Sequence, residues 1–308
     1  MVQLINVREW PVERVLDLLL KDKTTKKNII FATGGYFEKG VEIDPKTQIT
    51  RGSVLGFDTN VIQPRVFKTQ SEQADRTKSH AEVFTPSWLC NKMNNHIDSE
   101  WFGRENVFNT EGEKSWKTNP EKIVFPGDRH WTDYVNNKRL EITCGEAPYL
   151  VSRYDTATGQ IIPITDRIGI LDRKLRVVGE NTDDIYAWME WTERAYQATY
   201  GYEYQGDNLL IARINLLMTF VEYMQDRWGE DPTDDELKKI ANIIAWNIWQ
   251  MDGLTGTVPL GEPIVEHEQM GFDLFGDFEE PEERSEPCRI YDWKANKSVT
   301  YNSIKGER

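Results

Sequence analysis

The sequence has no long hydrophobic run of the kind that crosses a membrane. No apolar stretch approaches the roughly 18 residues that a spanning helix needs. The first turns carry Arg8, Glu9, Glu13 and Arg14, so the N-terminus has no apolar signal-peptide core. We therefore expect a cytoplasmic protein that does not associate with membranes.

Cysteine and histidine are scarce and scattered. The three cysteines, Cys90, Cys144 and Cys288, lie far apart and form neither a Cys-x-x-Cys pair nor an even disulfide set. The four histidines show no metal-ligand spacing either. We expect reduced structural thiols and no metal site.

The chain also lacks an excess of basic residues. Its formal charge is −14, and the 37 basic and 51 acidic side chains are unevenly spread. Residues 1–80 carry 13 basic and 10 acidic side chains, or +3, which leaves 24 and 41, or −17, for the rest. Since binding to DNA phosphates needs clustered Lys and Arg, the chain is not expected to hold DNA unaided, and any contact favours the N-terminal third.

Three segments have the order strand, turn or acid, then helix. Residues 139–143 predict a strand that turns at Gly145, and Tyr200–Tyr204 predicts a strand around Glu203 with a helix over 208–224. Residues 247–252 predict a strand that ends in Asp252. This rhythm indicates an α/β fold with a Rossmann-like parallel sheet.

The remaining elements suggest how the chain is divided. A helix is expected over 12–20, a strand over 28–31, irregular structure over 103–137, an acidic linker over 262–286 and two strands within 288–301. We predict an N-terminal α+β extension over 1–80, a Rossmann-like domain over 81–260 with an insertion near 152–184, and an acidic linker with a C-terminal β-hairpin over 261–308.

Such a sheet can bind a nucleoside cofactor. Ligands of parallel α/β sheets lie outside the carboxyl ends of the strands, where a tight turn lets backbone approach and a carboxylate accepts from the ribose hydroxyls. The segment from Glu141 to Gly145, Glu203 and Asp252 can take these places in order.

Four segments resemble motifs of the gamma-type adenine-N6 DNA methyltransferases of restriction-modification systems. Residues 81–89, with Thr-Pro before a helix, resemble the first cofactor motif of that family, and residues 140–150 resemble its central glycine loop. Residues 200–217 match the strand whose acid binds ribose, and 247–254 match the strand whose acid reaches the adenine amino group.

The resemblance implies S-adenosyl-L-methionine as cofactor and a set of binding residues. These are Phe84, Thr85, Pro86, Glu141, Cys144, Gly145, Tyr149, Glu203, Tyr204, Asp252 and Gly253. The chain departs from the family by having Glu141 in place of Asp, and Ala147 followed by Pro148 in place of the second glycine, which narrows the approach of the backbone to the cofactor.

The catalytic signature of the family is missing. It consists of Asn or Asp, then Pro-Pro, then an aromatic residue, and it holds a flipped adenine. No Pro-Pro occurs in the 308 residues. In the family this signature follows the fourth strand, which pairs beside the first, so a chain that supplies only the first three strands leaves an open edge beside Glu141. The strands expected within 288–301, or another polypeptide, would cover that edge.

The leading hypothesis is a split methyltransferase for site-specific DNA methylation. This chain would bind the cofactor, and a second subunit would supply the catalytic strand and target recognition and bring the complex to DNA. The alternative is a non-catalytic regulatory or anti-restriction subunit. A third possibility is an acidic interaction protein that binds no cofactor.

Overall fold

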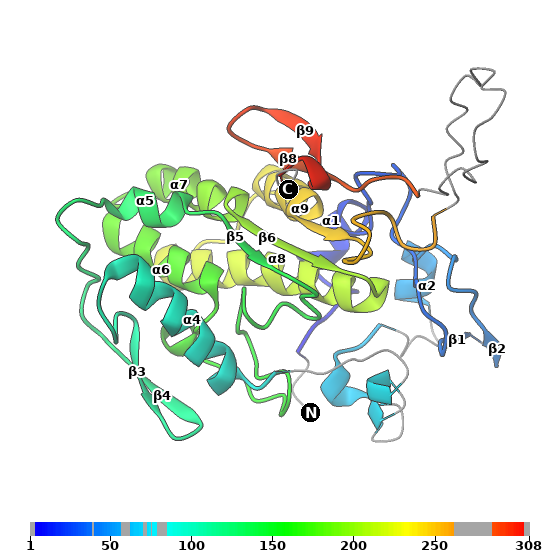
Figure 1. Cartoon of the computed structure of the whole chain (residues 1–308), viewed down its shortest axis with the longest axis horizontal. Coiled ribbons are helices and arrows are strands. Elements are labelled where there is room, and N and C mark those ends of the chain that lie inside the picture. Colours follow the sequence, from blue (N-terminus) through cyan, green and yellow to red (C-terminus); the bar gives the residue numbers. More distant parts are fainter. Residues whose placement is uncertain are drawn as a thin grey trace, which may run out of the picture.

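A computed structural model describes residues 4–38, 40–56, 62–69, 73–74, 76–78, 85–261 and 285–304. It is a mixed α/β structure with a parallel three-stranded sheet and helices packed against it (Figure 1). The strands are β1 (Phe37–Glu38), β2 (Val41–Glu42), β3 (Asn109–Gly112), β4 (Ser115–Thr118), β5 (Arg139–Glu141), β6 (Thr199–Glu203), β7 (Ile248–Gln250), β8 (Arg289–Asp292) and β9 (Lys297–Thr300). The α-helices are α1 (Val12–Leu19), α2 (Arg51–Leu55), α4 (Ser87–Phe102), α5 (Trp131–Asn136), α6 (Ile170–Asn181), α7 (Ile185–Gln197), α8 (Gly206–Trp228) and α9 (Asp234–Asn247), and the 3-10 helices are η1 (Arg65–Phe67), η2 (Ile164–Asp166) and η3 (Tyr301–Ile304).

The central sheet has the order β5-β6-β7, and all its strands are parallel. Helices α6 and α7 connect β5 to β6, and α8 and α9 connect β6 to β7. Parallel strands require such crossovers, which bring the carboxyl ends of all three strands to one edge. The strands predicted at 139–143, 200–204 and 247–252 are therefore confirmed as neighbours.

Helix α8 is the centre of the hydrophobic core. Nearly all of its residues up to Met224 are buried, because α1, α6, α9 and the sheet surround it. Residues 152–184, interpreted as an insertion, include η2 and α6, and the apolar residues of α6 belong to the same core.

A second, smaller core lies on the other face of the sheet. Tyr202 of β6 packs against Trp249 of β7 with ring centroids 5.7 Å apart, and Tyr301 packs against both rings. The β8–β9 hairpin belongs to this cluster and lies beside α9 (Figure 1). The two strands predicted within 288–301 are thus confirmed, but they do not pair with β5.

The structure corrects two local predictions. Residues 28–31 form isolated bridges rather than a strand, since Gln250 binds the backbone of Ile30 through its side chain. The stretch 103–137, predicted as irregular, contains the β3–β4 hairpin and α5. The turn consists of Glu113 and Lys114, and the left-handed backbone of Lys114 lets the hairpin close within a polar sequence.

The spacing of Thr233 and Glu236 in the sequence predicts a capping box at the start of a helix, and the structure confirms it at the start of α9. The Thr233 hydroxyl accepts from the Glu236 amide, and a Glu236 carboxylate oxygen accepts from the Thr233 amide at 2.8 Å. Thr233→Ala should lower the free energy of unfolding by about 1 kcal/mol, because the Glu236 amide loses its acceptor and the Glu236 carboxylate loses the hydroxyl that donates to it. Urea denaturation measures this loss. Thr255→Ala, in an exposed loop, is the control, and equal losses in both variants would contradict the capping role.

Among the residues that the structure describes, no helix combines the length and the apolar composition needed to cross a bilayer.

Candidate functional site

Three predicted site segments meet at the carboxyl edge of the sheet. The loop after β5 contacts the Glu203 carboxylate at the end of β6 directly. The start of α4 lies within electrostatic range of Glu141, and Glu141 lies within electrostatic range of Glu203. Phe84, the other residue predicted from the first cofactor motif, lies outside the described residues.

The loop after β5 has an alternating left-handed backbone. Thr143, Gly145 and Ala147 have φ angles of 46°, 54° and 65°. Ala147 therefore keeps the conformation that glycine favours, at a cost of about 1 kcal/mol. The buried Cys144 side chain packs against Gly201 of β6, where a built Cβ would lie 3.3 Å from the Cys144 sulfur. The loop is thus seated directly on the neighbouring strand.

Glu203 anchors this loop. One carboxylate oxygen accepts from the Gly145 amide at 2.8 Å, and the other accepts from the amides of Tyr204 and Gln205. Burial raises the pKa of Glu203, while the three amides act in the opposite direction. A carboxylate has about four acceptor positions, so one remains for a ligand hydroxyl.

Glu141 is the second buried carboxyl group at this edge. Burial raises its pKa well above the usual range; the amides of Tyr149 and Leu150 oppose the shift, and the nearby Glu203 adds to it. Its Oε2 atom has no hydrogen-bond partner among the described residues. A ligand group that hydrogen-bonds to this atom would remove the cost of leaving it unpartnered.

The start of α4 lies beside the loop. The Ser87 amide donates to Asp155 at 2.7 Å, and the Thr156 hydroxyl donates to the Thr85 carbonyl at 3.2 Å. Thr85 also interacts with the Tyr149 hydroxyl, which lowers the pKa of Tyr149 against the raising effect of burial. Thr85 and Pro86 are therefore held at the helix entry that the sequence predicted.

Asp252, Gly253 and Tyr204 lie farther along the same edge. Asp252 closes a turn, since its Oδ1 accepts from the Leu254 amide at 2.8 Å. Gly253 lies against Tyr202, where a built Cβ would be 2.9 Å from the ring. Burial raises the pKa of Tyr204, and the charge of Asp252 adds to this effect, so the two side chains are neighbours.

The N-terminal extension contributes residues that the sequence reasoning missed. Lys68 and Arg76 each place a nitrogen 3.0 Å from the same oxygen of Asp207, in the first turn of α8. The amide of Arg65 donates to Glu146 in the loop after β5. The only sequence signal was the basic character of 65–78, which does not identify the partners.

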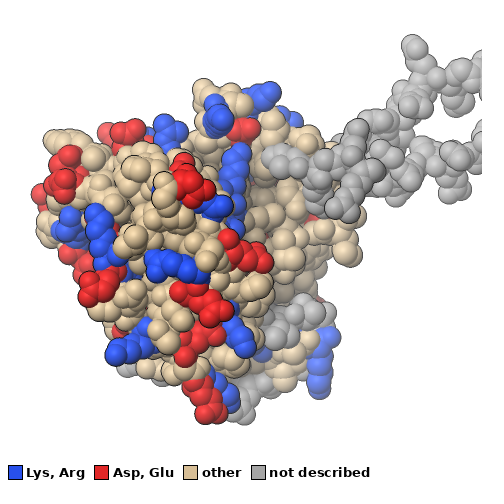
Figure 2. Space-filling model, turned by 60° about the vertical axis from the view of Figure 1, so that its left-hand side comes forward, with Lys and Arg blue, Asp and Glu red and all other residues tan. Residues whose placement is uncertain are grey.

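On the face in Figure 2, basic and acidic side chains are interspersed, with no broad area of one sign. Over the residues that the structure describes, no group of three or more His, Cys, Asp or Glu side chains could hold a metal ion. The three cysteines are free and buried.

Comparison with known proteins identifies no family. The chain matches no model of a known protein family, no curated protein and no solved structure.

Proposed function

We propose that this chain is the S-adenosylmethionine-binding subunit of a split adenine-N6 DNA methyltransferase, built on a Rossmann-like sheet. The observation that carries the proposal is the meeting of the start of α4, the left-handed loop after β5 and the carboxylate of Glu203 at one edge of a parallel sheet. These are the three features that a nucleoside cofactor needs there.

Two carboxyl groups support the fit of the cofactor. Glu203 keeps one acceptor position beside the loop, which suits a ribose hydroxyl, and the unpartnered Oε2 of Glu141 suits a polar group of the methionine part. The bound cofactor would supply the methyl group. The residues of this chain would bind and orient it, since the sequence lacks the Asn-Pro-Pro-Tyr type of signature.

The free edge of β5 supports the need for a second subunit. Within the described part of the chain, β5 pairs with β6 alone. Leu140 and Ile142 at this edge are 43% and 62% exposed, although parallel strands are normally covered. A partner strand that pairs with β5 would cover them. The same partner would carry most of the DNA contact, in keeping with the net charge of −14.

Calorimetric titration with S-adenosylmethionine tests the proposal. The wild-type chain should bind one equivalent. Asp252→Asn can keep the turn through its amide oxygen but loses the charge, and it should weaken binding about 10-fold, or about 1.4 kcal/mol. Glu203→Ala should weaken binding further, because the Gly145 amide also loses its acceptor.

Asp235→Asn on α9 is the matched control, because its side chain is 97% exposed. It should bind the cofactor as the wild type does. A folded wild-type chain that does not bind S-adenosylmethionine would overturn the assignment of the cofactor. Methylation of DNA by this chain alone would overturn the split arrangement.

A further inference from the structure

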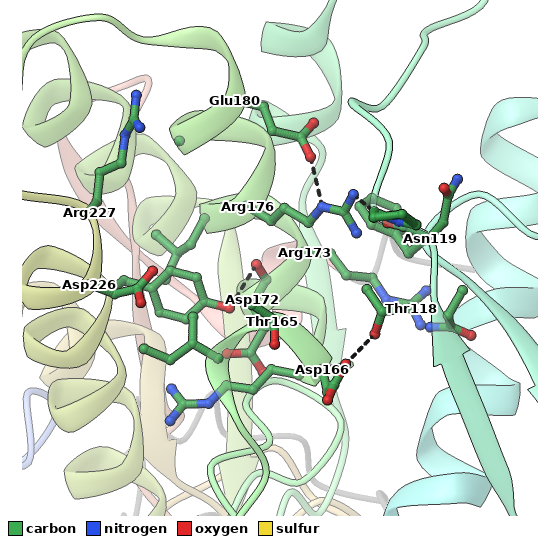
Figure 3. Close-up of a pocket in the computed structure, with 18 of the residues that line it drawn as sticks. Thr118, Asn119, Thr165, Asp166, Asp172, Arg173, Arg176, Glu180, Asp226 and Arg227 are labelled. Atoms are coloured by element: carbon green, nitrogen blue, oxygen red, sulfur yellow. Dashed lines mark hydrogen bonds and ion pairs between the residues drawn. The ribbon is translucent and has the colours of Figure 1, made fainter.

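A cavity of about 710 Å³ lies between α6, η2 and the C-terminal part of α8 (Figure 3). Two arginines of its wall are already paired with carboxylates. Arg176 pairs with Glu180 at 2.7 Å, as Figure 3 shows, and Arg173 pairs with Asp98 at 2.6 Å. These cations are therefore occupied within the protein, unlike the lysines of another surface.

The loop after α1 contains closely spaced lysines without ion pairs. Within the described part of the chain, no carboxylate forms an ion pair with Lys21, Lys23 or Lys26. Asp22, in the same loop, is buried and accepts from two backbone amides of its own turn. Its charge is thus used within the loop.

The lysines of this loop repel one another. Burial lowers the pKa of Lys23 to about 8, and the charges of Arg213, Lys26 and Lys21 add to this effect. A nearby like charge disfavours the charged form of an amine, whereas an anion favours it. A phosphate group beside these ammonium groups would therefore relieve their repulsion.

Three aromatic side chains continue this surface. The Nζ atoms of Lys23 and Lys26 lie 5.6 Å and 5.2 Å from the centre of the Trp246 ring. The ring centroids of Trp246 and Tyr291 are 5.1 Å apart, and those of Tyr291 and Trp293 are 4.6 Å apart. All three aromatic residues are only partly buried. The basic-aromatic strip consists of Lys21, Lys23, Lys26, Trp246, Tyr291 and Trp293.

The basic-aromatic strip lies at the amino end of β7. Trp246 is two residues before this strand, and the indole of Trp293 donates to Asn247 at 2.8 Å. The β8–β9 hairpin, which brings Tyr291 and Trp293 to this place, lies beside α9 (Figure 1). The predicted cofactor-binding residues lie at the carboxyl ends of the strands, so the strip is separate from the proposed cofactor site.

We propose that the basic-aromatic strip binds single-stranded nucleic acid. Phosphate groups lie against the lysines, and unpaired bases stack on the exposed parts of the aromatic rings. A duplex fits less well, because its bases are already stacked on one another. The net charge of −14 does not prevent this contact, since charges more than about 10 Å away are largely screened at 0.1 M salt.

Fluorescence anisotropy of a labelled oligothymidylate of about 12 nucleotides tests this proposal. The full wild-type chain should bind it with a Kd of about 1–100 µM. Between about 50 and 200 mM salt, the logarithm of the association constant should fall with the logarithm of the salt concentration, with a slope of about −0.7 for each phosphate contacted. A duplex of the same length should bind more weakly.

A double substitution tests the cationic part of the strip. Lys23→Gln combined with Lys26→Gln should weaken binding about 10-fold and make the salt slope less steep by about 1.4, because two phosphate contacts are lost. The matched control is Lys114→Gln with Lys117→Gln. Both of these lysines are exposed on the β3–β4 hairpin, which lies far from the β8–β9 hairpin (Figure 1). The control should bind like the wild type.

Two substitutions of Tyr291 test the aromatic part. Tyr291→Leu removes the ring and should weaken binding about 10-fold without a change in the salt slope. Tyr291→Phe keeps the ring and loses only the hydroxyl that donates to Asn296, so it should bind like the wild type. Thermal unfolding of each variant shows that it is folded before the titration.

Three results would overturn the proposal. The first is a folded wild-type chain that does not bind the oligothymidylate, and the second is a duplex that binds at least as tightly. The third is an equal loss of binding in the two double lysine variants, or in Tyr291→Leu and Tyr291→Phe.

Discussion

Replacement of Arg213 by methionine should lower the free energy of unfolding by at least about 3 kcal/mol. The guanidinium group of Arg213 is fully buried and donates to the carbonyls of Ile248 at 2.8 Å, Leu19 at 2.5 Å, Lys21 at 3.0 Å and Ala245 at 3.3 Å. These carbonyls belong to β7, to the end of α1 and the residues after it, and to α9. Methionine would fill much of the volume but leave all four without this donor.

The pKa of Arg213 also reflects the full burial of its guanidinium group. Burial lowers it to about 10, and Asp22 opposes the shift. The guanidinium group therefore stays charged near neutral pH, where it donates to the carbonyls. Urea denaturation of Arg213→Met and of Lys238→Met, in which an exposed α9 lysine is replaced, measures the effect. A loss no larger than that of Lys238→Met would contradict the role of Arg213.

The sequence predicted most reliably the elements whose signals are local. The spacing of Thr233 and Glu236 predicted the start of α9, and the acid-ended strand before an apolar helix predicted β6 and α8. These signals depend on residues within a few positions of each other. The order of the sheet followed because successive parallel strands need helical crossovers.

Elements determined by distant contacts were predicted poorly. The apolar residues Trp88, Leu89 and Met93 predict the packed face of the helix after Thr85 and Pro86. In the structure Met93 is 50% exposed, and the buried face of α4 contains Asn91 and Asp98. The reason is Arg173 of α6, which pairs with Asp98 and donates to Asn91. Because 75 residues separate Arg173 from Asp98, periodicity along α4 cannot reveal this interface.

The candidate site also contains some residues that local sequence signals predicted and others that depend on distant contacts. Glu203 and Gly145 were selected one at a time from strand ends, and the structure joins them by a hydrogen bond. The contribution of Lys68 and Arg76 could not be predicted, because they contact Asp207 across 139 and 131 residues. The first turn of α8, next to Glu203, is therefore positioned by the N-terminal extension.

Asp207→Asn should also lower the free energy of unfolding strongly, by about 3–5 kcal/mol at neutral pH. The Asp207 side chain is fully buried and shared by Lys68 and Arg76, so the neutral amide leaves two buried cations without their common carboxylate. Chemical denaturation at pH 7 measures the loss. Asp235→Asn, the same substitution at an exposed position of α9, should change stability by no more than about 0.5 kcal/mol.

The pH dependence distinguishes this ion pair from simple packing. Burial alone would raise the pKa of Asp207, but the charges of Lys68 and Arg76 outweigh it and hold the pKa well below the usual range. A depressed carboxyl pKa contributes stability above the unfolded value near 3.9, and that stability is lost as the pH falls through the folded value. The stability gap between wild type and Asp207→Asn should therefore narrow below about pH 4. A gap that stays constant from pH 7 into that acid range would show that Asp207 acts through its shape and not its charge.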